Sequence, residues 1–288
     1  MASNQNSLDA VVKRAAAALR DSDALLITAG AGMGVDSGLP DFRGTQGFWK
    51  AYPVIAKLGL DFAQMANPDW FQKSPELAWA FYGHRLNLYR STLPHAGFDQ
   101  LLKVAARKPH GYFVFTSNVD GQFQKAGFEP EHIVECHGSI HHFQCTKPCD
   151  DHIWDAANEV IVVNEEHFKA VPPLPLCPHC GGLARPNVLM FGDNAWNPGR
   201  TWKQESRLKT WLARLRKNKA KVAVVEIGAG TAIPTVRHRS EDVAAEFAAA
   251  LIRINPRESE VPSGGFELAL NAAEGIRRIC TKSGLRLG

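Results

Sequence analysis

Apolar residues recur along this chain in two patterns, which predict strands and helices. Short, almost continuous apolar runs are typical of buried strands. Residues 8–19 carry apolar positions at helical spacing and predict an opening helix on a face of the sheet, and residues 266–279 predict a closing helix. Together the patterns predict an α/β fold. The strand-like runs occupy residues 24–27, 112–115, 222–227 and 251–254.

Residues 46–91 interrupt this rhythm, because they are rich in aromatic residues and in helical patterns and contain no strand-like run. We interpret them as a helical module inserted into the α/β fold.

Length and charge narrow the class of protein. The chain has 288 residues, which is enough for one large α/β domain or for a large and a small one. Its net charge of +4 is too mild to indicate nucleic-acid binding. No apolar run approaches the roughly 20 residues of a membrane span, and the N-terminal sequence lacks the regions of a signal peptide. We expect a cytoplasmic protein with no membrane contact and no direct nucleic-acid contact.

Glycines follow the first strand, at Gly30, Gly32 and Gly34, where a strand would pass into a helix. Glycines let a backbone approach a pyrophosphate, whose charge the amides at a helix N-terminus stabilise. Gly-x-Gly by itself is a weak signal and can be a simple turn, and the full dinucleotide-binding fingerprint is absent.

The next loop, Ser-Gly-Leu-Pro-Asp-Phe-Arg-Gly at 37–44, brings together an acid, an aromatic ring and a guanidinium group, as ligand-binding loops do. It resembles the cofactor-binding loop of the sirtuins, which are NAD-dependent protein deacylases. Gly34 stands where that family usually has serine. By this resemblance, the cofactor would contact Gly30, Ala31, Gly32, Asp41, Phe42 and Arg43.

Polar residues at the end of the strand at 112–115 resemble the Thr-Gln-Asn-Ile-Asp motif of the sirtuins. Polar groups at this end of a parallel strand line a crevice, although Asn-x-Asp is also a common turn. The resemblance places Ser117, Asn118 and Asp120 at the nicotinamide ribose and carboxamide, with Asn118 also catalytic. Ser117 replaces the glutamine of the family and is too short to make all of its ribose contacts.

His137 is followed by Gly-Ser, and this sequence resembles the His-Gly-Ser motif that carries the sirtuin general base. With an unperturbed pKa of about 6.5, histidine has its neutral form available near neutral pH. His141 and His142 are interpreted as structural or peptide-contacting residues.

Tyr82 and Arg85 are three residues apart and would share one helix face, where a phenol beside a guanidinium makes a carboxylate receptor. With Ala66 they resemble the acyl pocket of class III sirtuins, which remove succinyl, malonyl or glutaryl groups. The small Ala66 would leave room for a long acyl chain. The alternative, a surface arginine and a core tyrosine on an amphipathic helix, stays open.

Four of the six cysteines form two close pairs, and in a chain without a secretory signal they favour a metal site over disulfides. Four thiolates leave no open position on a tetrahedral Zn²⁺, so this zinc would be structural. His179 is a possible competing ligand, and residues 151–175 form an excursion between the pairs. The predicted ligands are Cys145, Cys149, Cys177 and Cys180.

Three more segments resemble sirtuin motifs. The segment at 185–193 matches the edge that pairs with the substrate peptide, with Val188 and Phe191 as walls of the lysine tunnel and Gly192 beside them. The glycines after residue 227 match a cofactor loop only approximately, because Ala229-Gly230 replaces the family's Thr-Ser. By this resemblance the remaining cofactor contacts are Gly228, Gly230, Thr231 and Asn255.

The motifs together identify a divergent or bacterial-type sirtuin with class III-like acyl-pocket residues. The resemblance implies a Rossmann-like parallel sheet with helices on both faces, formed by 1–45, 92–143 and 186–288. The helical module at 46–91 and a zinc ribbon at 144–185 would form a small domain.

The implied activity is NAD-dependent deacylation of acylated lysine in proteins or peptides, with NAD as cosubstrate and free lysine, nicotinamide and O-acyl-ADP-ribose as products. Two alternatives stay open. One is a mono-ADP-ribosyltransferase or NAD glycohydrolase, and the other is a non-catalytic NAD-sensing protein that binds through its zinc ribbon. The sequence leaves the oligomeric state open.

Overall fold

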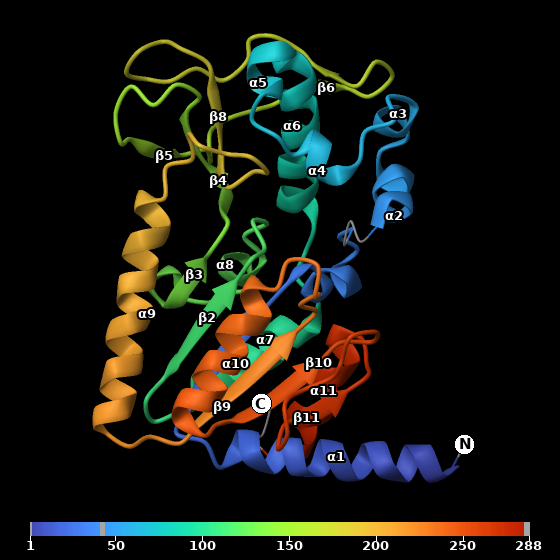
Figure 1. Cartoon of the computed structure of the whole chain (residues 1–288), viewed down its shortest axis with the longest axis vertical. Coiled ribbons are helices and arrows are strands. Elements are labelled where there is room, and N and C mark those ends of the chain that lie inside the picture. The colour runs from blue at the N-terminus through green and yellow to red at the C-terminus, as the bar shows by residue number, and fades with distance from the viewer. Residues whose placement is uncertain (1, 41–43, 285–288) are drawn as a thin grey trace.

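The computed structural model describes residues 2–40 and 44–284, and it places the side chains of 7–40 and 48–284 (Figure 1). Its centre is a six-stranded parallel sheet in the order β11-β10-β9-β1-β2-β3. Numbered along the chain, this is the order 3-2-1-4-5-6 of a dinucleotide-binding fold. The strands are β1 (Ala24–Ala29), β2 (Tyr112–Thr116), β3 (Ile133–Glu135), β9 (Val222–Ile227), β10 (Ala250–Ile254) and β11 (Phe266–Leu268).

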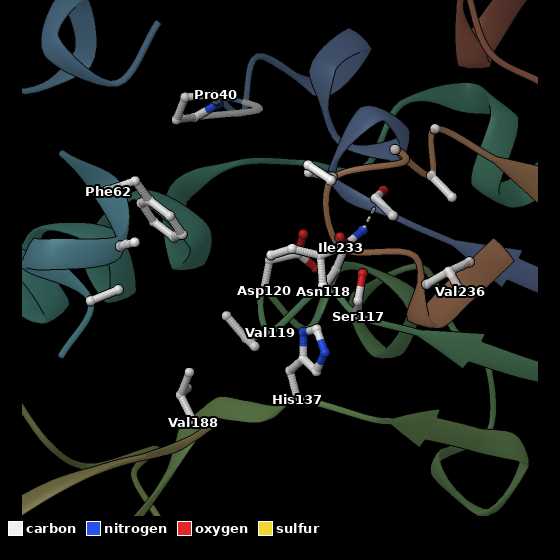
Figure 2. Close-up of a pocket in the computed structure, with 18 of the residues that line it drawn as sticks. Pro40, Phe62, Ser117, Asn118, Val119, Asp120, His137, Val188, Ile233 and Val236 are labelled. Carbon is white, nitrogen blue, oxygen red and sulfur yellow. Dashed lines mark hydrogen bonds between the residues drawn. The ribbon is translucent and has the colours of Figure 1, made fainter. Parts of the chain in front are cut away.

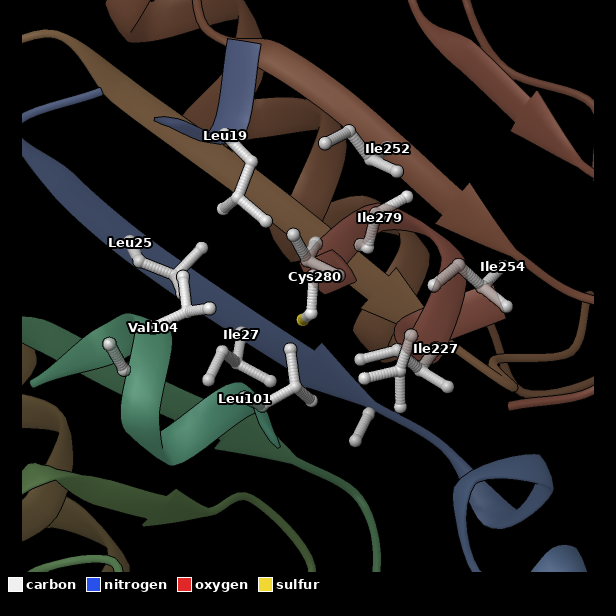
Figure 3. Packing of buried hydrophobic residues seen from close by; sticks show 14 of the residues in the cluster. Leu19, Leu25, Ile27, Leu101, Val104, Ile227, Ile252, Ile254, Ile279 and Cys280 are labelled. Atoms are coloured by element: carbon white, nitrogen blue, oxygen red, sulfur yellow. The ribbon is translucent and has the colours of Figure 1, made fainter. Parts of the chain in front are cut away.

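Helices cover both faces of this sheet, as predicted. Alternate residues of a strand point to opposite faces. On one face, Leu25 and Ile27 of β1 pack against α1 (Ala2–Arg20), α7 (Ala96–Ala105) and α11 (Ala272–Lys282), as Figure 3 shows.

On the other face, Ala24 and Leu26 pack with residues of α9 (Gly199–Lys217) and α10 (Thr235–Phe247). Because β1 is completely buried on both faces, its sequence reads as a continuous apolar run.

The sequence prediction was wrong at two element boundaries. Residues 266–268 were assigned to the closing helix, but they pair in parallel with β10 as the edge strand β11, and α11 begins only at Ala272. The glycine-rich turn after β1 leads into two short 3-10 helices, η1 (Ala31–Met33) and η2 (Val35–Ser37), and not directly into an α-helix.

A second, smaller layer stands above the carboxyl ends of the parallel strands (Figure 1). It combines a helical module with an antiparallel sheet in the order β5-β4-β8, and the two share one apolar core around Trp79 and Phe143. The division of the chain into two domains stays a prediction. The elements of this layer are α2 (Gly44–Ala51), α3 (Pro53–Lys57), α4 (Phe62–Met65), α5 (Trp70–Lys73), α6 (Pro75–Ser91), β4 (Gly138–Cys145), β5 (Ile153–Asp155) and β8 (Ala184–Val188).

Short elements complete the chain. Helices α8 (Gln122–Lys125) and η3 (Pro130–His132) connect β2 to β3. The excursion at 151–175 contains β6 (Val163–Asn164) and β7 (Lys169–Ala170). It packs on α6, where Asn87 donates a hydrogen bond of 2.9 Å to the carbonyl of Ile161. A Cβ atom on Gly83 would lie 2.3 Å from the Ile161 side chain, so this glycine permits the close contact.

Within the described part of the chain, none of the helices has both the length and the apolar character required to cross a membrane.

Candidate active site

Two glycine turns meet where the strand order reverses, between β1 and β9. The amide of Gly32 donates to the carbonyl of Gly228 at 3.0 Å. A Cβ atom on Gly30 would lie 2.8 Å from the Cα of Ala229, and one on Gly228, whose φ is +63°, would lie 2.4 Å from the Cα of Gly32. Only glycines let the turns approach this closely. Ligands of such sheets bind in the crevice at this reversal point.

A cavity of about 1060 Å³ opens from this reversal point toward the small layer. In Figure 2 the ring of His137 lies next to Ser117 and Asn118, between Val188 on one side and Val236 on the other. The cavity brings together most of the predicted site. The predicted residues that line it are Gly30, Ala31, Ala66, Tyr82, Arg85, Ser117, Asn118, Asp120, His137, Val188, Phe191, Gly228, Gly230 and Thr231.

Three predicted residues of the described structure do not line this cavity. Gly32 and Gly192 are not among the residues that line the cavity. Asn255 is fully buried, and its amide donates to the carbonyl of Ala229 at 2.8 Å and accepts from the amides of two residues of its own loop. Asn255 therefore stabilises the loop that follows β9 from inside the protein. Asp41, Phe42 and Arg43 lie outside the described residues.

The catalytic turn after β2 is held by its own side chains. Thr116 accepts the amide of Asn118 at 3.0 Å, and the Asn118 side chain donates to the carbonyl of Gly30 at 3.0 Å. His137 is half-buried, and burial lowers its pKa while a hydrogen bond with the backbone of Ser117 opposes that shift. His137 is therefore neutral at pH 7, the form that accepts a proton.

Asp120 is a buried acid that lines the cavity. Its carboxylate accepts the amide of Gln122 at 2.9 Å, and burial is the largest cause that raises its pKa to about 6. His141 donates through Nε2 to the Asp120 carbonyl at 2.9 Å, a contact that fits the structural one of the two roles predicted for it. Such a shifted acid in a cavity is typical of a functional site.

The predicted carboxylate receptor lines the cavity from α6 of the small layer, whereas Gly228 follows β9 of the parallel sheet. Arg85 is only 6 % exposed, so the alternative of a surface arginine is wrong. Its guanidinium donates through Nε and Nη2 to the hydroxyl of Tyr89 at 3.1 and 2.9 Å. Tyr82 is 1 % exposed, and its hydroxyl has no hydrogen-bond partner among the described residues.

Tyr89 was missed by the sequence reasoning, although it continues the helical spacing of Tyr82 and Arg85 by one more turn of α6. The rings of Phe62, Phe81, Tyr82 and Tyr89 all lie within 5.8 Å of the Arg85 carbon Cζ. These contacts stabilise a buried cation and fix its direction.

The cavity lining contains a second residue that the sequence reasoning missed. Glu258 follows β10, and its carboxylate accepts the hydroxyl of Thr231 at 2.6 Å. The missing side chain of Gly230 leaves room for this carboxylate, because a Cβ atom there would lie 3.3 Å from Glu258 Oε2. A carboxylate after the strand that follows a glycine turn is the usual partner of a ribose hydroxyl in dinucleotide-binding folds. Its position after the strand that follows the glycine turn was the available signal.

The four predicted zinc ligands converge in the small layer. Their Sγ atoms all lie within 4.8 Å of one another, and the pairs Cys145–Cys180 and Cys149–Cys177 are each 3.7 Å apart. A tetrahedron with Zn–S bonds of about 2.3 Å gives this spacing. His179 pairs with Asp150 and is not part of the group, so it is not a competing ligand. The cluster fits one structural zinc ion.

The chain is similar to known proteins over most of its length. A family model described as the Sir2 family matches residues 30–210. The NAD-dependent protein deacylase of Thermococcus sibiricus is 32% identical over 186 residues, which are 64% of this chain and 66%, just under two thirds, of that protein. The NAD-dependent protein deacylase of Aquifex aeolicus is 28% identical over 252 residues, 87% of this chain and 91% of that protein.

Solved structures share the fold. The complex of a Sir2 homologue with NAD has a TM-score of 0.72 at 24% identity and covers 96% of this chain and 94% of its own. A Sir2 variant with a deacetylated p53 peptide and 3'-O-acetyl ADP-ribose has a TM-score of 0.68 at 22% identity, covering 94% of this chain and 98% of its own.

Proposed function

The chain belongs to the Sir2 family of NAD-dependent protein deacylases, and we propose that it removes acyl groups that end in a carboxylate, such as succinyl, from lysine side chains of proteins. The observation that carries this preference is the buried pair of Tyr82 and Arg85, which line the cavity from α6 of the small layer.

The cofactor half of the cavity fits NAD. The facing turns at Gly30 and Gly228 are free of side chains, as a pyrophosphate requires. Asn118, Ser117 and Asp120 would hold the nicotinamide end, and Thr231 and Glu258 the adenosine end. When bound, NAD supplies the sugar carbon at which the acyl oxygen of the substrate replaces nicotinamide.

The residues of the chain bind, orient and move protons around that carbon. Neutral His137 lies beside Asn118 and accepts a proton from a ribose hydroxyl. Asn118, fixed by Gly30, holds the turn beside the reacting sugar. The apolar side chains of Val188 and Val119 line the path to this point and exclude water.

The part of the cavity that α6 lines determines which acyl group is preferred. An acyl-lysine that enters past Val188 and Phe191 places its acyl terminus toward Ala66, Tyr82 and Arg85. A carboxylate there would accept from the Tyr82 hydroxyl and form a charge-assisted contact with Arg85. An acetyl group is too short and uncharged, so it gains neither interaction.

The peptide backbone around the lysine would bind beside β8 by strand addition, which supplies affinity without reading side chains. The complex of the structural neighbour with a p53 peptide supports a protein or peptide substrate.

The test is mass spectrometry of one peptide that carries either acetyl-lysine or succinyl-lysine, incubated with NAD. We expect the succinyl group to leave faster, Arg85→Met to reverse the order, and His137→Ala to abolish both reactions. Arg90→Met is the matched control, because Arg90 lies on the same helix but bonds carbonyls of the 151–175 excursion. It should keep the succinyl preference.

Two results would overturn the proposal. Faster removal of acetyl by the wild type would refute the carboxylate preference. Release of nicotinamide without loss of either acyl group would instead assign ADP-ribosyl transfer or NAD hydrolysis.

A further inference from the structure

The positive charge of this protein is concentrated in one stretch. Residues 199–221 contain nine Lys or Arg and one Glu, a net charge of +8. The whole chain has a net charge of only +4, which leaves −4 for all its other residues. The overall charge led to the prediction of no direct nucleic-acid contact, but this distribution points the other way.

Helix α9 carries most of this charge and lies along one edge of the molecule, beside β3 (Figure 1). Its inner face, with Leu208, Trp211 and Leu215, is buried against the parallel sheet. The basic residues therefore project outward. Lys203, Lys209, Arg214 and Lys217 are all exposed, and at 1.5 Å per residue they extend over about 21 Å of helix.

These four cations are not neutralised by the protein. Elsewhere in the stretch, Arg200 pairs with Glu135, Arg207 with Glu131 and Arg216 with Glu246. Six basic residues of the stretch remain, and four of them, Lys203, Lys209, Arg214 and Lys217, lie on α9. No acidic side chain of the described chain forms an ion pair with these four. We call these four residues the basic face of α9.

The positive surface continues past the first turns of α9 into a second cavity of about 630 Å³. Five basic side chains line it against three acidic ones, Asp120, Glu131 and Asp155. The five are Arg90, Lys125, Arg200, Lys203 and Arg207.

We propose that the basic face of α9 binds the phosphate backbone of a nucleic acid, independently of base sequence. Lys and Arg in a row along a helix are the electrostatic footprint of such binding. The one acid of α9, Glu205, is paired with Arg239 of α10. A protein partner is a poorer fit, because the centres of protein interfaces are apolar and depleted of lysine. The only large apolar side chain among the exposed ones of α9 is Trp202, at one end of the row.

The test is fluorescence anisotropy of a labelled 20-base-pair DNA duplex and of an RNA duplex of the same length, titrated with the full chain at 50 to 200 mM salt. If about three phosphates are neutralised, the affinity should fall with a log–log slope of about −3. The triple variant Lys209→Gln, Arg214→Gln, Lys217→Gln should lose most of the affinity at 50 mM salt and flatten the slope by about two or more.

A matched control removes the same three charges elsewhere. Lys13, Lys50 and Lys57 are exposed and lie on other helices, and their replacement by Gln should leave the duplex affinity within about twofold of the wild type. Thermal unfolding and NAD binding of both triple variants should match the wild type, because all six side chains are exposed and outside the active-site cavity.

Three outcomes would overturn the proposal. The first is an affinity that does not depend on salt, and the second is equal losses in the two triple variants. The third is tighter binding of a labelled polyglutamate than of either duplex, which would assign the basic face to an acidic protein segment.

Discussion

The side-chain amide of Asn118 donates a hydrogen bond of 3.0 Å to the carbonyl oxygen of Gly30. This contact joins the catalytic turn after β2 to the cofactor turn after β1, two strands that lie side by side in the sheet. The same bond therefore positions the side chain of Asn118 and the backbone of Gly30, which we propose contact the reacting sugar and the pyrophosphate.

We predict that Asn118→Ala lowers turnover by about 100-fold, the usual loss when one preorganised polar group of an active site is removed. Nicotinamide release in the presence of an acylated peptide measures it. Asn87→Ala is the control, because it also removes an amide hydrogen bond to a carbonyl, that of Ile161 at 2.9 Å, and Asn87 does not line the cavity. That variant should lose some stability and keep its turnover, and equal losses of turnover would contradict the role of Asn118.

Tyr82→Phe should weaken the acyl preference without lowering the stability of the protein. The Tyr82 hydroxyl is buried without a partner among the described residues, so its removal should leave the free energy of unfolding unchanged or slightly increase it. The same change should lower kcat/KM for succinyl-lysine by roughly tenfold, since a hydrogen bond to a charged group is lost. Acetyl-lysine should be unaffected, and a parallel loss on both substrates would show that the hydroxyl does not contact the acyl carboxylate.

Asp120→Asn should stabilise the protein at neutral pH while weakening its function. Burial raises the pKa of Asp120 in the folded protein to about 6 from its ordinary value of 3.8. The unfolded chain therefore releases this proton at lower pH, and the ionised carboxylate destabilises the fold increasingly as the pH rises from about 4 through 6. Removing it should raise the free energy of unfolding at pH 7.5 by on the order of 2–3 kcal/mol.

The measurement is chemical denaturation at pH 4 and pH 7.5, together with NAD affinity at pH 7.5. The stabilisation should disappear near pH 4, where the folded protein already carries the proton, and NAD should bind more weakly. Asp99→Asn, at an exposed acid of α7, is the control and should change stability little at either pH. A stabilisation that persists at pH 4 would contradict the assigned cause.

Removal of zinc should inactivate the enzyme, although the zinc ligands do not line the active-site cavity. Strand β4 begins at Gly138, next to His137, and ends at the zinc ligand Cys145. Because four thiolates bind the ion, its loss frees the end of this strand and destabilises the small layer. We expect one zinc per chain by elemental analysis, and a lower Tm and activity after chelation that zinc restores and magnesium does not. A metal-free protein with unchanged Tm and activity would refute this structural role.

Several features followed from local sequence alone. The glycines at 30 and 228, the apolar run of β1 and the two cysteine pairs each reflect a constraint within a few residues, such as a turn that excludes side chains or a strand buried on both faces. The family motifs added the order of the site along the chain. These signals were sufficient to predict the α/β fold, the zinc cluster and most of the cavity lining.

Tertiary structure decided what depends on residues that are distant in sequence. Residues 266–268 form a strand only because the edge of β10 is available to pair with them. Glu258 reaches Thr231 only because the chain returns beside the turn after β9.

The tertiary structure also decided the environment of Arg85. Its burial depends on Phe62 of α4 as well as on the rings of its own helix, and a helical spacing alone fits a buried or an exposed arginine equally well. The sequence determined which chemical groups are present and in which local conformations, because those depend on neighbours along the chain. Their burial, partners and pKa values depend on the packing of the whole chain, which only the three-dimensional structure provides.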